Sequence, residues 1–551
     1  MTDSTATGGT ILAKALQRSG IDTFFFIMGA PMLQAEAEAI RLGLRGIDVR
    51  HEQAGVMAAH AYARLRGKPA ACMAASGPGT TNMVTGVAHA WADCVPVLVL
   101  GGSSPTDQSG KGVFQELDQV TMMEPCTKWA ERVHQAARIP ELVDRALRIC
   151  VSGKPGPVYL DFPADVLTAP VDESKIVWPS PFNAFERPRP AVSSHDLSRI
   201  SSAIASAKRP IIIFGGGALW ADAGDVLTKF IDKTEIPFFT TPQARGLVPD
   251  DHPLCFLSAR ATAFREADLV LVLGTRMNYM SGHVSPPRFR PDVRVVRIDV
   301  DAQEIADSPN LEVGACADLK VALEQLLGVI KDRPNAAAIK EWNDHLRSVN
   351  ETKSAAQEKA LSNPDTPIHP LRLCREVRDF LDRDAVLVVD GQEILNFGRQ
   401  AIPSYRPGHR LNSGTFGTMG VGMPFGVGAK VARPEAQVVV LHGDGSFGLN
   451  AMEFDTAVRH KLPLIVVVSL NGGWTGDPER ERPGRELGYT RFDRMAEALG
   501  GHGEWVESPE EIRPALERAK AAVAAGKPAL VNVVTDWRAR ATTVAFTRYV
   551  T

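Results

Sequence analysis

Residues 436–446 read AQVVVLHGDGS, and residues 462–474 read LPLIVVVSLNGGW. Each segment is a short apolar run that ends in glycines and a polar side chain, which is typical of a strand buried in a parallel sheet. The amphipathic stretch between them, residues 449–460, predicts a covering helix. Doubly wound sheets bind ligands at the carboxyl ends of their strands. The two segments therefore predict an α/β fold with a ligand site in the loops that follow them.

The same alternation of buried strands and amphipathic helices recurs outward along the chain. It predicts three doubly wound parallel-sheet domains, at residues 1–170, 190–345 and 366–540, with a further tail at 541–551. A proline-rich passage near 170–192 and a charged helical passage at 336–360 connect the domains. The other strand candidates are DTFFFIMGA (22–30), PAACMAAS (69–76), VPVLVLGG (95–102), GPVYLDFP (156–163), RPIIIFGGGA (209–218), ADLVLVLGTR (267–276), VRVVRIDVD (293–301), DAVLVVDGQ (384–392) and PALVNVVTDW (528–537).

Composition excludes several classes of protein. The chain has 551 residues, of which 44% are hydrophobic and 23% charged, and its formal net charge is -3. This balance predicts a globular protein with no basic surface for nucleic acid or an anionic membrane. The apolar runs are too short to cross a bilayer, and the amino-terminal segment does not resemble a signal peptide. The seven cysteines form no CxxC pair, so we expect reduced thiols in the cytoplasm.

The loops after the two quoted strands carry the residues of a metal–phosphate site. Asp444 and Asn471 offer oxygen ligands, and a glycine carbonyl can add a third, which suits Mg²⁺. Gly443 and Gly445 would let the backbone approach a diphosphate, with Ser446 and the start of the following helix donating hydrogen bonds to it. Asp-Gly and Asn-Gly are also ordinary turn dipeptides. Their joint position, each after its own buried strand, favours the binding site.

These motifs and their order resemble the thiamine-diphosphate enzymes of the acetolactate synthase and pyruvate decarboxylase superfamily. Four further segments match family motifs: RHEQAGVMAAHAYAR (50–64), ASGPGTTN (75–82), GPVYLDFPADV (156–166) and GTFGTMGVGMPFGVGAK (414–430). The resemblance covers essentially the whole chain. It implies a pyrimidine-binding domain, a central Rossmann-like domain and a diphosphate-binding domain. It also implies a homodimer or homotetramer with active sites at the subunit interface.

The resemblance also assigns roles to individual residues. Asp444, Asn471 and the Gly473 carbonyl would hold Mg²⁺ on the diphosphate. Met419 would impose the bent form of the cofactor, and the Gly417 carbonyl would accept from its aminopyrimidine. Glu52 would hydrogen-bond the pyrimidine ring and thereby promote removal of the reactive proton. The full set of expected cofactor-binding residues is Gln392, Gly417, Met419, Gly443, Asp444, Gly445, Ser446, Asn471, Gly473 and Trp474.

The branch of the family is indicated by fewer residues. Gln115 lies where oxalyl-CoA decarboxylases have a Tyr-Glu pair, and a glutamine there is similar to 2-hydroxyacyl-CoA lyases and benzaldehyde lyase. Arg276 and Asn278 resemble the stretch along the CoA channel of acyl-CoA members, and Arg399 belongs to a second cationic group. We expect a carbon–carbon lyase that cleaves 2-hydroxyacyl-CoA to formyl-CoA and an aldehyde or ketone, or runs the reverse condensation, with Glu52 and Gln115 as catalytic residues.

Several alternatives stay open at this point. Oxalyl-CoA decarboxylase is the second expectation, and an acetolactate synthase or benzaldehyde lyase type without CoA is the third. The glycine-rich turn after residue 214 suggests a nucleotide loop, so the central domain is either vestigial or binds an ADP-type ligand or FAD. A nucleotide-dependent dehydrogenase would leave the GDG motif, Asn471 and Glu52 unexplained, and a silent relative would be expected to lose one of them. The tail at 541–551 is either a lid or a frayed end.

Overall fold

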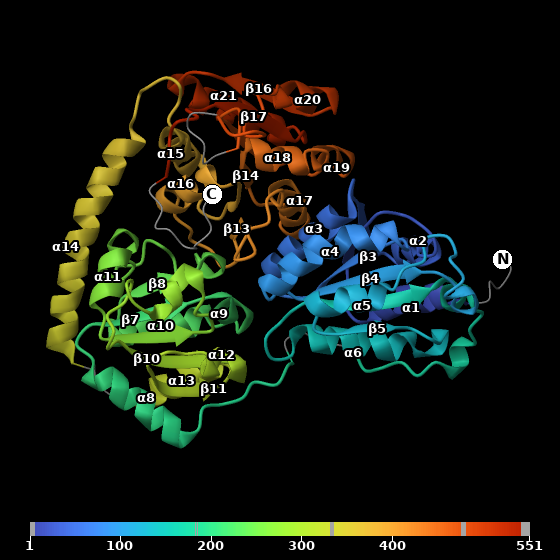
Figure 1. The fold of residues 1–551 in the computed structure, drawn as a ribbon, viewed down its shortest axis with the longest axis horizontal. Coiled ribbons are helices and arrows are strands. Elements are labelled where there is room, and N and C mark those ends of the chain that lie inside the picture. Colours follow the sequence, from blue (N-terminus) through green and yellow to red (C-terminus); the bar gives the residue numbers. More distant parts are fainter. Residues whose placement is uncertain (1–5, 182, 184–185, 331–334, 475–480, 542–551) are drawn as a thin grey trace.

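The computed structural model describes residues 6–181, 183, 186–330, 335–474 and 481–541. It contains three α/β domains, each built on its own parallel sheet, as Figure 1 shows in blue, green and orange to red. The expected fold class is therefore confirmed. The expected tail falls almost entirely on residues outside the described ranges, so its role as a lid stays a prediction. No helix in the described ranges combines the length and the apolar character that crossing a membrane requires.

The N-terminal sheet has the strand order β2-β1-β3-β4-β6-β5. Its strands are β1 (Thr23–Phe26), β2 (Arg45–Asp48), β3 (Ala70–Ala74), β4 (Val97–Ser103), β5 (Ala130–Arg132) and β6 (Val158–Pro163). The covering helices are α1 (Gly8–Arg18), α2 (Leu33–Arg41), α3 (Glu52–Arg66), α4 (Pro78–Ala92), α5 (Gln119–Met123), α6 (Ile139–Val151) and α7 (Ala164–Thr168). Sequence patterns missed β2 and β5, because these short strands are only partly buried and carry no apolar run.

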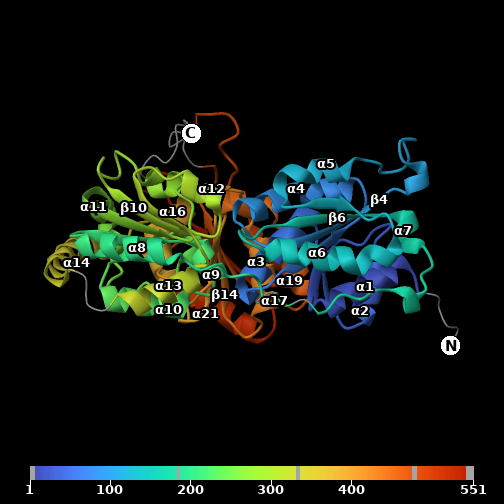
Figure 2. The same ribbon diagram turned by 90° about the horizontal axis from the view of Figure 1, so that it is seen from below.

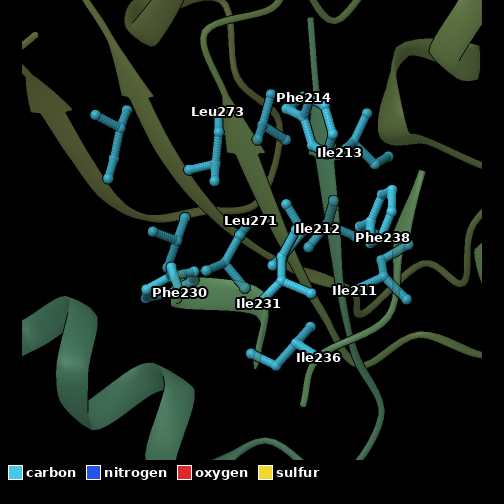
Figure 3. Packing of buried hydrophobic residues seen from close by; sticks show 14 of the residues in the cluster. Ile211, Ile212, Ile213, Phe214, Phe230, Ile231, Ile236, Phe238, Leu271 and Leu273 are labelled. Atoms are coloured by element: carbon cyan, nitrogen blue, oxygen red, sulfur yellow. The ribbon is translucent and has the colours of Figure 1, made fainter. Parts of the chain in front are cut away.

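The central sheet has the order β11-β10-β9-β7-β8. Its strands are β7 (Pro210–Phe214), β8 (Phe238–Thr240), β9 (Leu269–Leu273), β10 (Arg294–Asp299) and β11 (Leu311–Cys316). Its helices are α8 (Ser194–Ser206), α9 (Gly216–Trp220), α10 (Gly224–Thr234), α11 (Arg260–Glu266), α12 (Ala302–Ala306) and α13 (Leu319–Val329). Figure 3 shows the aliphatic and aromatic side chains of β7, β8, β9 and α10 packed into one core.

The long helix α14 (Ala336–Leu361) runs from the central domain towards the C-terminal one along the left edge of Figure 1. It buries Ile339, Trp342 and Leu346 in the core of the central domain. The helix thus crosses the expected domain limit at residue 345 and spans the connection between the two domains.

The C-terminal sheet has the order β13-β12-β14-β15-β17-β16. Its strands are β12 (Val386–Asp390), β13 (Arg410–Asn412), β14 (Val438–Gly443), β15 (Ile465–Leu470), β16 (His502–Val506) and β17 (Ala529–Val534). Its helices are α15 (Pro370–Phe380), α16 (Glu393–Ala401), α17 (Gly422–Ala432), α18 (Asp444–Leu449), α19 (Glu453–Arg459), α20 (Phe492–Ala498) and α21 (Pro509–Ala524).

Helices α3 and α17 join the N-terminal and C-terminal domains, and Figure 2 shows them side by side at the centre of the molecule. Their close approach depends on a small residue, because a Cβ atom on Gly428 would lie 2.1 Å from the carbonyl oxygen of Ala58. One continuous cluster of buried side chains includes residues of both helices, such as Met57 and Phe425. The two domains therefore share one close-packed core.

Candidate active site

The two motif loops meet at one edge of the C-terminal sheet. Strands β14 and β15 are parallel neighbours, with Gly443 paired to Ser469, so Asp444 and Asn471 follow adjacent strand ends. The Asp444 carboxylate accepts a hydrogen bond of 2.7 Å from the backbone N–H of Gly472, which ties the two loops directly together. The sheet register thus produces the arrangement expected from the strand order.

A pocket with about 580 Å³ of open space lies at this edge. It is lined by residues that follow β12, β14 and β15 or lie near them. Nine of the expected cofactor-binding residues line it: Gln392, Met419, Gly443, Asp444, Gly445, Ser446, Asn471, Gly473 and Trp474. Gly417 is the one expected residue outside this lining. It lies in an exposed loop with a φ of +72°, a conformation that favours glycine.

Asp444 is the charged centre of the pocket. Burial raises the pKa of its carboxyl to about 6, although backbone N–H groups of Gly445 and Gly472 oppose that rise. In the described ranges, no lysine, arginine or histidine forms an ion pair with Asp444. A buried carboxylate that only backbone groups stabilise suits a bound cation. Asn471, with its side-chain amide oxygen, and Gly473, with its backbone carbonyl, line the same pocket. Together with Asp444 they offer the oxygen ligands that Mg²⁺ prefers.

The glycines of the pocket are required by close contacts. A Cβ atom on Gly445 would lie 2.6 Å from the Trp474 ring, and one on Gly473 would lie 2.5 Å from the carbonyl oxygen of Arg485. Trp474 is held in place by its backbone N–H, which donates to the same Arg485 carbonyl at 2.7 Å. The GDG turn therefore lies directly under the Trp474 ring. Larger residues at these positions would displace the loops.

Sequence patterns missed two buried polar residues behind the pocket, Asp390 and His442. Asp390 accepts hydrogen bonds from the backbone N–H groups of Gly391 (2.7 Å) and Gly422 (2.9 Å), and burial raises its pKa to about 6. The His442 ring lies 3.2 Å from the Ser446 hydroxyl, and burial lowers the pKa of His442 to about 3. Each residue ends an apolar strand segment, and this signal could have identified them.

Glu52 lies in the N-terminal domain, outside this pocket. It begins α3, and its carboxylate accepts a hydrogen bond of 2.9 Å from the side chain of Asn82 on α4. Two of the quoted motifs, residues 50–64 and 75–82, therefore meet at Glu52. The described residues that line the diphosphate-side pocket all come from the C-terminal domain. Within one chain, Glu52 and Asp444 therefore do not share a pocket.

Gln115 packs against the turn formed by residues 75–82. Its backbone is left-handed, with a φ of +59°, and its side-chain oxygen accepts a hydrogen bond of 2.7 Å from the Ser76 hydroxyl. A second glutamine, Gln119, was not anticipated. It is completely buried, accepts from the Gly77 N–H at 2.6 Å and donates to Asp161 at 2.8 Å. Neutral amides therefore hold this turn in position.

The three residues expected to bind CoA are not brought into one pocket. Arg276 and Asn278 line a cleft of about 700 Å³ between the N-terminal and central domains, where Arg276 donates to the carbonyl of Ala92. The Asn278 side chain accepts from the Met280 N–H at 3.0 Å. Arg399 lies in a separate place near Tyr279 and Arg245, and burial lowers its pKa.

The glycine-rich turn of the central domain lines the same cleft. Gly216 and Gly217 face it together with Asp299, whose pKa burial raises to about 6. Lys154 of the N-terminal domain reaches across the cleft to Glu304, at 2.6 Å. A Cβ atom on Gly217 would lie 2.7 Å from the Gly274 carbonyl oxygen, so the turn packs tightly against the loop after β9.

Comparison with known proteins identifies the family. Matches to the thiamine pyrophosphate enzyme family cover its N-terminal TPP binding domain (residues 6–122), central domain (197–326) and C-terminal TPP binding domain (395–533). The chain is 32% identical over 553 residues to 2-hydroxyacyl-CoA lyase 1 of Homo sapiens, with 96% of this chain and 94% of that protein covered. It is 35% identical over 541 residues to an acetolactate synthase large subunit of Mycobacterium tuberculosis. It is 33% identical over 542 residues to oxalyl-CoA decarboxylase of Escherichia coli, and for both relatives 96% of this chain and 95% of the relative are covered. The expected family is confirmed: the chain belongs to the thiamine pyrophosphate enzymes and uses thiamine diphosphate as its cofactor.

Proposed function

We propose that this enzyme is a carbon–carbon lyase that cleaves 2-hydroxyacyl-CoA to formyl-CoA and an aldehyde or ketone. In this reaction the C1–C2 bond breaks, the C2 hydroxyl loses its proton and becomes a carbonyl, and C1 gains a proton. The condensation of formyl-CoA with an aldehyde or ketone is the same path in reverse. The observation that carries the proposal is the pocket around buried Asp444, in a chain that aligns over 96% of its length with a 2-hydroxyacyl-CoA lyase.

The residues at the ends of β14 and β15 would hold the cofactor and its metal. Asp444, Asn471 and the Gly473 carbonyl would coordinate Mg²⁺, and Ser446 with the glycines of the GDG turn would face the diphosphate. Thiamine diphosphate, when bound, supplies the chemistry that stabilises negative charge on a carbonyl carbon. Met419 would impose the bent form of the cofactor, and the Gly417 carbonyl would accept a hydrogen bond from its aminopyrimidine.

A second copy of the chain would complete the site. Glu52 and Gln115 lie on the N-terminal domain, away from the pocket that Asp444 occupies, so we propose that they reach the pocket of a partner subunit in a homodimer or homotetramer. There Glu52 would hold a proton at the pyrimidine ring, and Gln115 would donate a neutral hydrogen bond near the reacting carbons. Exposed apolar side chains support an interface, since Phe114 is 86% exposed and Leu449 54%.

An acyl-CoA substrate is supported by buried positive charge between the central and C-terminal domains. Burial and the nearby Arg288 and Arg399 lower the pKa of Arg260 to about 10. Neither Arg260 nor Arg399 forms an ion pair with a carboxylate in the part of the chain that the structure describes. Guanidinium groups without a carboxylate suit the phosphates of CoA, and Arg276 and Asn278 would contact the CoA chain further along.

Three further expectations are retained as proposals. The cleft between the N-terminal and central domains, beside Gly216 and Asp299, would take an ADP-type ligand. The domain limits would lie near 1–170, 190–345 and 366–540. The cytoplasm is proposed as the location because all seven cysteines are free.

A product assay tests the reaction. The enzyme with thiamine diphosphate and Mg²⁺ would be incubated separately with a 2-hydroxyacyl-CoA, with formyl-CoA plus a ketone, and with oxalyl-CoA, and the products identified by mass spectrometry. We expect formyl-CoA from the first and a 2-hydroxyacyl-CoA from the second. Turnover of oxalyl-CoA alone would replace the proposal by a decarboxylase, which the Escherichia coli relative makes the second candidate. Condensation of 2-oxoacids without CoA would instead indicate a synthase.

A further inference from the structure

A cluster of three buried polar residues lies outside the sites described above. His60 is on α3, His89 is on α4, and Asp93 directly follows α4 at its C-cap. All three side chains are completely buried. The cluster is at the junction where α3 packs against α17 of the C-terminal domain, and the Phe425 ring lies 4.8 Å from the His60 ring and 5.6 Å from the His89 ring.

The ligand atoms of the three side chains converge. One atom from each residue lies within 4.8 Å of the others. The Nε2 atom of His89 is 3.4 Å from the Asp93 carboxylate, and that of His60 is 3.8 Å from it. Two ligands of a tetrahedral zinc ion, each about 2.0–2.1 Å from the metal, are separated by roughly 3.3 Å. The two distances from the histidines to Asp93 lie within about half an ångström of this value, and the widest separation in the cluster would have to shorten by up to about 1.5 Å.

The polar atoms of the cluster lack hydrogen-bond partners. Both ring nitrogens of His60, both of His89 and Oδ2 of Asp93 are buried and form no hydrogen bond in the described structure. Buried polar atoms are almost always satisfied, by protein, water or a bound ion. One unbonded ligand atom from each of the three residues converges here, an arrangement that a bound ion would satisfy.

The neighbouring groups leave the converging atoms of the cluster unbonded. The other carboxylate oxygen of Asp93, Oδ1, accepts a hydrogen bond of 3.4 Å from the Thr415 N–H. Arg64 donates to the carbonyls of Gln243 (3.3 Å) and Arg410 (3.2 Å) and leaves Asp93 Oδ2 unbonded.

We propose that His60, His89 and Asp93 bind a transition-metal dication, for which Zn²⁺ is the probe. Two imidazoles and a carboxylate are a common ligand set for zinc and related metals, whereas Mg²⁺ prefers oxygen ligands alone. Asp93 also lines the cleft between the N-terminal and central domains. An ion would enter from this cleft past Asp93, and a water would take the fourth position. This ion would be distinct from the Mg²⁺ proposed at Asp444, which lies in the C-terminal domain.

The bound ion would act as a structural link. It would join α3, which begins with Glu52, to the carboxyl end of α4, whose Asn82 holds the Glu52 carboxylate. Binding of an ion to the folded state alone raises stability, and each tenfold excess over the dissociation constant adds about 1.4 kcal/mol. The measurable consequences are therefore metal retention and thermal stability rather than a new reaction.

The test uses the enzyme saturated with thiamine diphosphate and Mg²⁺. The enzyme is incubated with Zn²⁺ and dialysed without chelator. Its zinc content is then measured by inductively coupled plasma mass spectrometry. We expect one zinc per chain in the wild type and at least a tenfold lower content in His60→Gln and His89→Gln. Zinc should raise the melting temperature of the wild type only. The matched control is His502→Gln, which removes a partly exposed imidazole 2.7 Å from Glu504 and should retain zinc.

Two further measurements keep the test decisive. Asp444→Asn should retain the zinc, because the ion does not occupy the magnesium site. If the histidine variants fail to fold by circular dichroism, Co²⁺ added to the wild type should produce the visible absorption of a tetrahedral nitrogen–oxygen site. Wild-type protein without retained zinc or cobalt absorption would overturn the proposal. Undiminished zinc in folded His60→Gln and His89→Gln would do the same.

Discussion

The N-terminal and C-terminal domains share one topology and differ in chemistry. Numbered within each domain, both sheets have the strand order 2-1-3-4-6-5. The helices after the second strand, α3 and α17, pack against each other, so the two domains face one another through equivalent elements. The chemical difference lies in the loops at the strand ends, where doubly wound folds bind their ligands.

The turn after the third strand illustrates the difference. In the N-terminal domain it is Ser76–Gly77 after β3, held by the neutral amides of Gln115 and Gln119. In the C-terminal domain the equivalent turn after β14 holds Asp444, a buried carboxylate whose pKa is raised to about 6. The same backbone position is therefore neutral in one domain and suited to a cation in the other. Fold similarity alone does not assign function; the side chains at these positions do.

The largest effect on turnover is expected from replacing Glu52, the candidate catalytic carboxylate of the N-terminal domain. Glu52→Gln should lower kcat by about 10²–10⁴-fold, because a positioned proton-transfer group contributes that much, while cofactor affinity changes little. Steady-state kinetics and calorimetric titration with thiamine diphosphate measure the two quantities. Glu141→Gln, on an exposed side chain that is paired with Arg138, serves as the control. Normal turnover of Glu52→Gln would contradict the catalytic role of this domain.

Removal of the Asp444 carboxylate, in the C-terminal domain, should lower the affinity for the cofactor. Asp444→Asn keeps the size of the side chain but removes its charge. We expect a loss of about 100-fold in cofactor affinity in the presence of Mg²⁺, since breaking a buried charge interaction costs about 3 kcal/mol or more. The measurement is the dissociation constant at fixed Mg²⁺, with the half-exposed Asp382→Asn as control. An unchanged, Mg²⁺-dependent affinity would remove Asp444 from the metal site.

A pH effect is expected at the seam between the two domains. Glu453 on α19 accepts a hydrogen bond of 3.0 Å from the Arg50 N–H, and burial raises its pKa from 4.5 to about 7. The folded state therefore binds a proton more tightly than the unfolded state. Stability is greatest below about pH 4.5 on account of this group and falls, by up to about 3 kcal/mol, as the pH rises to 7. Glu453→Gln should flatten this dependence in denaturant titrations at pH 5 and pH 8. A parallel slope in wild type and variant would show that Glu453 is not its source.

The smallest effect concerns the contact of α3 with α17. Gly428→Ala places a Cβ atom 2.1 Å from the Ala58 carbonyl oxygen, so the helices must shift, and we expect a loss of about 1–3 kcal/mol in the free energy of unfolding. Gly328→Ala on α13 is the matched control, because its Cβ would meet nothing within 4 Å. That variant should be neutral or stabilised by up to about 1 kcal/mol. Equal stabilities of the two variants would show that the helices do not need this close approach.

Much of the pocket could be predicted from the sequence because its residues follow strand ends. Asp444 and Asn471 come directly after consecutive apolar runs, and adjacent parallel strands bring such positions together. Gln119 could not be found in this way. It lies on the short helix α5, and its partners Gly77 and Asp161 come from distant elements. Nothing in the local pattern distinguishes a buried glutamine from a surface one.

The sequence by itself determined the α/β class, the family and the residues of the GDG pocket, because these depend on local periodicity and on motifs at strand ends. Only the tertiary structure decided which distant side chains converge. It separated Arg399 from Arg276 and Asn278, left Glu52 outside the pocket of its own chain, and gathered His60, His89 and Asp93 at one point. The physical reason is that the order of the strands in a sheet fixes where each strand ends, and therefore where the residues that follow it lie. Convergence of side chains from different helices is set by packing across domains, which no spacing along the chain encodes.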